Sequence, residues 1–121
     1  TLVPRPGEWP AFTAADRAFF ASEGGDASIG NRLPGLYRRA GLAVESIEIT
    51  IKSGHPGSAV WNWLTSYFLG VMDRYGRFPP FTPAGARRLK RQWTAAGRDR
   101  ASLLVGPALL DVVGRKTGRA G

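Results

Sequence analysis

The segment from Val44 to Ile51 is the feature of this sequence that most limits how the chain folds. Its three isoleucines alternate with Ser, Glu and Thr, and this period of two in β-branched residues predicts a strand with one apolar face. The only other strand predicted is Ser102–Gly114, bent at Gly106 and Pro107 because proline cannot donate to a ladder. Two strands make a poor sheet. The isoleucines are therefore expected to need a sheet edge that these 121 residues barely provide.

Helical patterns fill most of the remaining chain. We expect a helix over 14–22 capped by Thr13, one over 31–40 capped by Asn31, one over 58–74, and one that Thr82 caps with Pro83 at its first position. Trp61, Leu64, Phe68 and Met72 form the apolar stripe of the third, and Leu89, Trp93 and Ala96 that of the fourth. The order helix, helix, strand, two helices, strand predicts an α/β fold.

Composition excludes several classes of site. The chain has no cysteine, which rules out disulfides, thiolate metal sites and a cysteine nucleophile. No apolar signal segment is visible in residues 1–10, and the apolar stretch Val60–Met72 is shorter than the ~20 residues that a membrane span needs. We therefore expect a cytoplasmic protein without a membrane partner. The first residue is Thr1, so we also expect a chain that was processed or cut from something longer.

The net charge is +8, with 17 Lys and Arg against 9 Asp and Glu. Such an excess occurs in proteins that bind nucleic acid, membrane surfaces or acidic substrates, and equally on a solvated basic surface. The densest basic run is Arg87–Arg91. RNA-binding surfaces typically add exposed aromatic residues among the basic ones, whereas Trp93 lies on the apolar side of this helix. We interpret the run as a solvated helix face and expect no nucleic-acid partner.

Two segments resemble a known family. Residues 29–42 (IGNRLPGLYRRAGL) precede the isoleucine strand, and residues 105–107 and 112–116 (VGP and VVGRK) close the chain. Together these resemble the end of a class I S-adenosylmethionine-dependent methyltransferase of the ubiquinone/menaquinone-biosynthesis-like type. Family members read G-R-x-L-P-x-L, then A-G-L, into the sixth strand, and end an antiparallel seventh strand in G-R-K. The sequence departs at Asn31, where the family pattern has Gly or Arg.

The resemblance implies the C-terminal half of a doubly wound, Rossmann-like methyltransferase sheet. It divides one partial domain into a lid and short helix (1–30), a helix and the sixth strand (31–57), a helical cap (58–98), the seventh strand (99–116) and a tail (117–121). The implied cofactor is S-adenosylmethionine. A glycine-rich G-x-G-x-G loop and an acidic residue after the next strand would hold it, and both are missing here. The cofactor would therefore be bound mainly by residues of a missing N-terminal half.

The resemblance also implies candidate site residues, because ligands of open α/β sheets bind beyond the carboxyl ends of the strands. His55 follows the isoleucine strand and is the candidate catalytic base, since an imidazole accepts protons near neutral pH. It is also a candidate substrate-binding residue, with Asp26, Trp61 and Trp63. The alternatives are an exposed loop histidine, an Asx-type turn at Asp26 and a core position for Trp61. A metal site is not expected, because a lone histidine lacks co-ligands.

The implied activity is methyl transfer to a small-molecule acceptor. Its partner would be the N-terminal half of the same fold or another methyltransferase chain. Two other functions stay open at this point: a non-catalytic basic module that binds RNA or a protein, and a degenerate methyltransferase subunit.

Overall fold

The computed structural model describes residues 1–117 and has a mixed α/β fold. Along the chain its elements are β1 (Leu2–Val3), α1 (Trp9–Ser22), the 3₁₀ helix η1 (Ile29–Arg32), α2 (Leu33–Arg39), β2 (Leu42–Gly54), α3 (Ala59–Tyr75), α4 (Pro83–Ala96) and β3 (Leu103–Lys116). The predicted order of helices and strands is confirmed, and β1 is an addition. The strands form one antiparallel sheet in the order β1-β3-β2.

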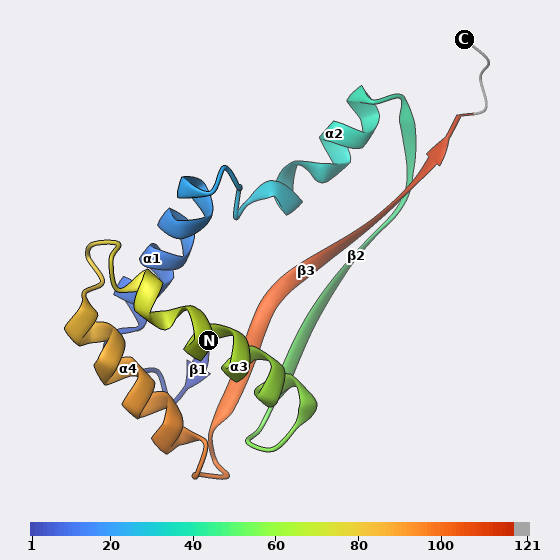
Figure 1. Cartoon of the computed structure of the whole chain (residues 1–121). Coiled ribbons are helices and arrows are strands. Elements are labelled where there is room, and N and C mark those ends of the chain that lie inside the picture. Colours follow the sequence, from blue (N-terminus) through green and yellow to red (C-terminus); the bar gives the residue numbers. More distant parts are fainter. Residues whose placement is uncertain (118–121) are drawn as a thin grey trace.

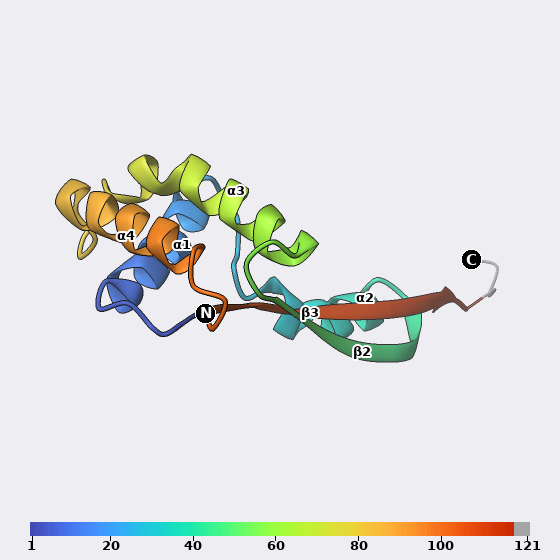
Figure 2. The same ribbon diagram turned by 90° about the horizontal axis from the view of Figure 1, so that it is seen from below.

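The molecule has two parts, as Figures 1 and 2 show. Helices α1, α3 and α4 gather into a helical body around β1 and the start of β3. From this body β2 and β3 extend as a long two-stranded ribbon, and α2 lies alongside it. The Tyr37 ring of α2 packs so closely on Gly114 of β3 that a Cβ there would lie 2.6 Å from the ring. Gly114 therefore leaves room for α2 on the ribbon.

The core lies within the helical body and is built around aromatic rings. Phe12 of α1 is at its centre and is fully buried. Its ring centroid lies 4.9 Å from that of Trp9, 5.3 Å from Phe68, 5.8 Å from Tyr75, and 6.0 Å from both Phe81 and Trp93. Leu2 of β1 and Leu104 of β3 belong to the same buried cluster. The sheet is thus anchored in the body only at one end.

Helix starts follow the expected capping chemistry in the second half of the chain. The Ser58 hydroxyl accepts a hydrogen bond from Trp61 N at 3.2 Å, and the Thr82 hydroxyl accepts one from Gly85 N at 2.9 Å. Pro83 occupies the first turn of α4, as predicted, and Leu89 and Trp93 are buried. These side chains satisfy backbone donors that have no partner within the helix.

The two predicted caps in the first half are wrong. α1 begins at Trp9 with Pro10 in its first turn, so Thr13 lies inside the helix and donates its hydroxyl to Pro10 O at 3.0 Å. Asn31 lies within η1, and α2 begins after Arg32 without a side-chain cap. In both cases a proline placed the helix start more strongly than a capping side chain, because its fixed φ is already helical.

Both predicted strands are longer in the structure. β2 extends the predicted 44–51 segment to 42–54, and β3 runs through Arg115 and Lys116. The register shifts between the pairs Ile51–Ala108 and Ser53–Val105, which confirms the irregularity predicted at Gly106 and Pro107. A second shift occurs beside Glu45. Of the predicted tail, residues 118–121 lie outside the described part.

Candidate functional site

His55 lies in the loop that joins β2 to α3, directly beyond the carboxyl end of β2. Its side chain is exposed, and its Nδ1 lies 3.0 Å from Pro56 O. Gly54 before it is buried against the start of α3, and Ser58 N donates to His55 O at 3.0 Å to close the turn. The loop is therefore held at both ends, while the imidazole faces solvent.

The Asp26 carboxylate forms its polar contacts within its own loop and with the adjacent helix η1. One carboxylate oxygen accepts a hydrogen bond from Ser28 N at 2.8 Å, and the other forms an ion pair with Arg32. The bond from Ser28 N, followed by the Arg32 guanidinium, lowers the pKa of the Asp26 carboxyl. This is the Asx-type turn that was expected as the alternative to a substrate role. Figure 1 also places the α1–η1 connection well apart from the β2–α3 loop, so Asp26 and His55 do not form one site.

The two tryptophans of α3 have different environments. Trp61 is only 4% exposed and belongs to the core, which matches its place on the apolar stripe. Trp63 is 56% exposed on the outer face of the same helix, and Tyr67 one turn later is also exposed. Because α3 starts at the His55 loop, the exposed ring of Trp63 lies on the element that follows the histidine. Trp63 and His55 remain the accessible candidates of the predicted set.

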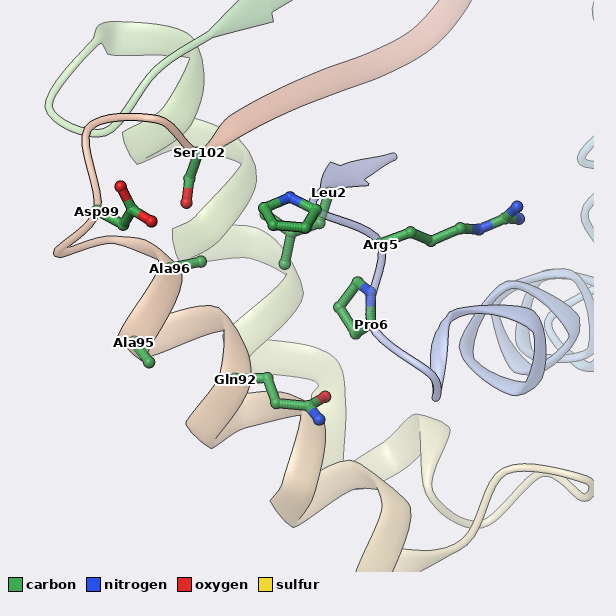
Figure 3. Close-up of a pocket in the computed structure, with 9 residues that line it drawn as sticks. Leu2, Arg5, Pro6, Gln92, Ala95, Ala96, Asp99 and Ser102 are labelled. Carbon is green, nitrogen blue, oxygen red and sulfur yellow. The ribbon is translucent and has the colours of Figure 1, made fainter.

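A depression lies elsewhere, between the N-terminal segment and α4 (Figure 3). It measures about 390 Å³ and has an apolar floor that includes Leu2 and Ala96. Figure 3 shows the Asp99 carboxylate and the Ser102 hydroxyl at the same end, whereas the Arg5 side chain extends away. The buried Ser102 hydroxyl has no hydrogen-bond partner among residues 1–117. The depression is open to solvent, and it contains none of the four predicted site residues.

Sequence reasoning missed this depression for a physical reason. Its walls come from residues 2–6 and 92–102, and these segments meet because β1 pairs with β3 at Leu2–Leu104. Local periodicity and short motifs cannot indicate a contact between residues that lie about one hundred positions apart in the sequence. The Pro-rich segment Val3–Pro10 predicts only extended backbone, and this prediction is wrong for Trp9 and Pro10, which lie in α1.

A polar cluster joins α1 to α3 inside the helical body. The Tyr75 hydroxyl donates to the Asp16 carboxylate at 2.6 Å, and the Tyr75 ring is fully buried. Burial, together with the neighbouring carboxylate, raises the pKa of the Tyr75 hydroxyl above its ordinary value of 10.0. Neither Tyr75 nor Asp16 lines the depression between the N-terminal segment and α4 or the one formed by Lys90, Arg91, Thr94, Ala95 and Arg98, and we assign the pair a structural role.

Part of the basic run on α4 is engaged in intramolecular ion pairs. Arg88 donates to Glu8 through two nitrogens at 2.7 and 2.9 Å, and Lys90 lies 2.9 Å from Asp73. These pairs tie α4 to the start of α1 and to α3. Trp93 is buried, as predicted, so no exposed aromatic ring of α4 accompanies the basic side chains.

The ribbon carries five of the ten exposed large apolar side chains found among residues 1–117. Ile47, Ile49 and Ile51 are 50%, 68% and 59% exposed on one face of β2. Leu109 and Val113 are exposed on the opposite face, because they pair with Thr50 and Ser46 rather than with the isoleucines. Both faces of the ribbon therefore expose branched apolar side chains.

No protein-family model, curated protein or solved structure matches this chain. Within residues 1–117 no three acidic or histidine side chains come together as metal ligands. No helix in that part of the chain has the length and apolar character needed to cross a bilayer.

Proposed function

We propose that this chain is the substrate-side portion of an S-adenosylmethionine-dependent methyltransferase that acts on a small molecule. The observation that carries the proposal is the ribbon. A sheet with apolar side chains on both faces is typical of α/β folds, in which helices cover both sides. Here α2 covers only part of one face, and three isoleucines are left at least half exposed. The ribbon is thus well suited to be the sixth and seventh strands of a larger doubly wound sheet.

The antiparallel pairing of β2 with β3 also supports the proposal. The resemblance implies an antiparallel seventh strand beside the sixth, with a helical cap inserted between them. α3 and α4 occupy that insertion, and β3 returns along β2 from Leu104 to Lys116. In a doubly wound sheet of this kind, His55 and the first turns of α3 would lie at the strand end where ligands of open α/β sheets bind.

The described residues do not fit the cofactor by themselves. A nucleotide-type cofactor needs a strand that turns through glycines into a helix, and an acidic side chain for its ribose. β2 ends at Gly54 and the turn after it contains Gly57, but Gly54 is packed against the start of α3, where it leaves no room for a ligand. We therefore derive no step of methyl transfer through the cofactor. What this chain offers is the acceptor's side of the site: an exposed imidazole at His55 and an exposed indole at Trp63.

The two alternatives have weaker support. An RNA-binding module would use the basic side chains of α4, yet Arg88 and Lys90 are already paired with carboxylates of this chain. A degenerate methyltransferase subunit would need the same larger sheet, supplied by a second polypeptide. The experiments below separate these cases.

The first test is thermal unfolding with and without S-adenosylmethionine, on the 121-residue chain and on a parent chain that contains it. We expect no shift for the 121 residues. For the parent chain, cofactor at 100 times its Kd would add about 2.7 kcal/mol, or about 5–10 °C for a domain of ordinary size. S-adenosylhomocysteine serves as a second ligand of the same site.

Each other outcome contradicts part of the proposal. A rise in Tm for the 121 residues alone would show that the cofactor site lies within this chain. Absence of a shift in the parent chain would reject a methyltransferase. Salt-sensitive binding of a 20-nucleotide RNA to the 121-residue chain, without any cofactor response, would favour the basic module instead.

The second test concerns His55. If the imidazole removes a proton from the acceptor, His55→Ala in the parent chain is expected to lower the rate of methyl transfer by about 10²–10⁴-fold. Arg77→Ala is the control, because this exposed residue lies beyond the far end of α3. Formation of S-adenosylhomocysteine measures the rate. If the His55→Ala variant transfers methyl groups at the rate of the unmodified parent chain, His55 is not a catalytic base and only forms part of the loop.

A further inference from the structure

We propose that the depression between the N-terminal segment and α4 is a binding site for a primary amine carried on a short aliphatic group. The polar end formed by Asp99 and Ser102 would hold the protonated amine, and the apolar floor would cover the aliphatic group. None of the residues that line this depression belongs to the proposed acceptor site at His55 and Trp63. The inference therefore goes beyond the proposed function and is tested separately from it.

The depression has the size and the lining of a small-molecule site. Its volume of about 390 Å³ lies within the range of about 300–1,000 Å³ that such sites occupy. Aliphatic and proline side chains supply most of the wall, namely Leu2, Pro4, Pro6, Ala95 and Ala96. Within residues 1–117 no aromatic ring takes part in the lining, so we expect an aliphatic group rather than a stacked ring.

One polar group of this lining has no partner. Ser102 is 2% exposed, and its hydroxyl oxygen forms no hydrogen bond within residues 1–117. A buried hydroxyl without a partner costs free energy that one hydrogen bond would recover. Figure 3 shows this hydroxyl directed into the depression, at the end where the Asp99 carboxylate lies. The short side chain can also turn between staggered positions to meet a ligand.

The Asp99 carboxylate supplies the charge at this end. Its Oδ1 accepts a hydrogen bond from Ala101 N at 2.9 Å, and Ser102 N donates to the Asp99 carbonyl at 2.9 Å. These two bonds hold the carboxylate in the turn between α4 and β3. Asp99 belongs to none of the four ion pairs found within residues 1–117. Within that range its second oxygen is left to accept a hydrogen bond from a ligand.

A protonated primary amine matches both groups. It carries three N–H donors and no acceptor, so one can bond to Asp99 Oδ2 and a second to the Ser102 hydroxyl. Hydrogen bonds from a cation to a carboxylate are stronger than those between neutral groups. An anionic ligand would instead be repelled by Asp99, and the Arg5 guanidinium of the lining extends away from this end. The polar end therefore favours a cation.

An NMR titration of the 121-residue chain with isopentylamine tests the site at about pH 6.5, where a primary amine is protonated. We expect the amides of Ala96, Asp99 and Ser102 to shift with one common Kd, on the order of 1 mM for so small a ligand. The amides of Ile47 and Ile49 in the ribbon are references that should not shift. 3-Methylbutanol, which has a hydroxyl in place of the amine, is the matched probe and is expected to bind about fivefold more weakly.

A free aliphatic amine and the amino end of a peptide carry the same chemistry. Leucinamide separates these two sources, because it is isopentylamine with a carboxamide added to the carbon that bears the amine. Tighter binding of leucinamide would identify the amino end of a peptide as the ligand. Binding of isopentylamine at least as tight as that of leucinamide would identify a free amine.

Two variants test the residues that hold the amine. Asp99→Asn keeps an oxygen for Ala101 N but removes the charge, and Ser102→Ala removes only the hydroxyl. Each change is expected to weaken the binding of isopentylamine about fivefold. Asp111→Asn is the matched control, because it makes the same change of charge at an exposed position of β3 in the ribbon. It should leave the Kd unchanged.

The melting temperature separates a binding role of Ser102 from a structural one. Because its hydroxyl has no partner within residues 1–117, Ser102→Ala is expected to leave the Tm of the free chain unchanged within about 2 °C. A larger fall in Tm together with unchanged binding would overturn the role of Ser102. Failure of both amines to bind, equal binding of 3-methylbutanol, or equal shifts at Ile47 and Ile49 would overturn the amine site. None of these outcomes bears on the cofactor test of the parent chain.

Discussion

Phe12→Ala is expected to lower the free energy of unfolding by about 3–5 kcal/mol, the range for deletion of a large buried aromatic side chain. The Phe12 ring contacts five other aromatic residues, which come from α1, α3, α4 and the turn before α4. Its removal leaves a cavity where three helices meet, and these rings are too rigid to fill it. Urea unfolding followed by tryptophan fluorescence measures the change.

Phe20→Ala is the matched control for this prediction, because it removes the same side chain from the same helix. Phe20 is exposed, and its ring lies beyond the core at the end of α1. The expected loss is about 1 kcal/mol, because Phe20 is already 37% exposed in the folded chain. Equal losses in the two variants would show that the body is not packed around Phe12.

Gly54→Ala is expected to destabilise the junction between β2 and α3 by about 2–4 kcal/mol, through overpacking and loss of a helix cap. A Cβ at this position would lie 3.1 Å from Val60 Cβ and 3.2 Å from Trp61 N, and it would collide with the Ser58 hydroxyl. That hydroxyl is the acceptor that caps α3. The change therefore acts on the loop that carries His55 as well as on stability.

Gly35→Ala provides the contrast, since nothing lies within 4 Å of a Cβ at this helical position of α2. Alanine restricts the unfolded chain more than glycine does, so this variant is expected to gain about 0.4–1 kcal/mol. Paired thermal scans of the two glycine variants measure the difference. If Gly54→Ala leaves the free energy of unfolding unchanged, α3 must be able to move away from β2 without destabilising the fold.

Local patterns predicted most of the elements because each is decided by neighbouring residues. The alternation of Ile47, Ile49 and Ile51 with polar residues identified β2, and Thr82 with Pro83 identified the start of α4. The stripe through Trp61 and Met72 correctly predicted burial of both residues. Where a proline and a capping residue competed, as at Pro10 and Thr13, the helix followed the proline.

The arrangement of the candidate site residues in space could not be predicted from local patterns. Asp26 and His55 were both predicted to line one pocket, but the structure separates their loops and uses Asp26 in an Asx turn. The depression between Pro6 and Ala96 had no signal in the sequence. Whether a loop residue meets another depends on how helices pack, and that is decided by long-range contacts.

The sequence by itself thus determined the helices, the two long strands and the apolar stripes, because propensity, periodicity and capping act over a few residues. Only the tertiary structure decided that Leu2 pairs with Leu104 and that one end of the ribbon is anchored in the body. Strand pairing joins segments far apart in the chain. Its register is selected by the burial of side chains such as Leu104 in a core that exists only once the chain has folded.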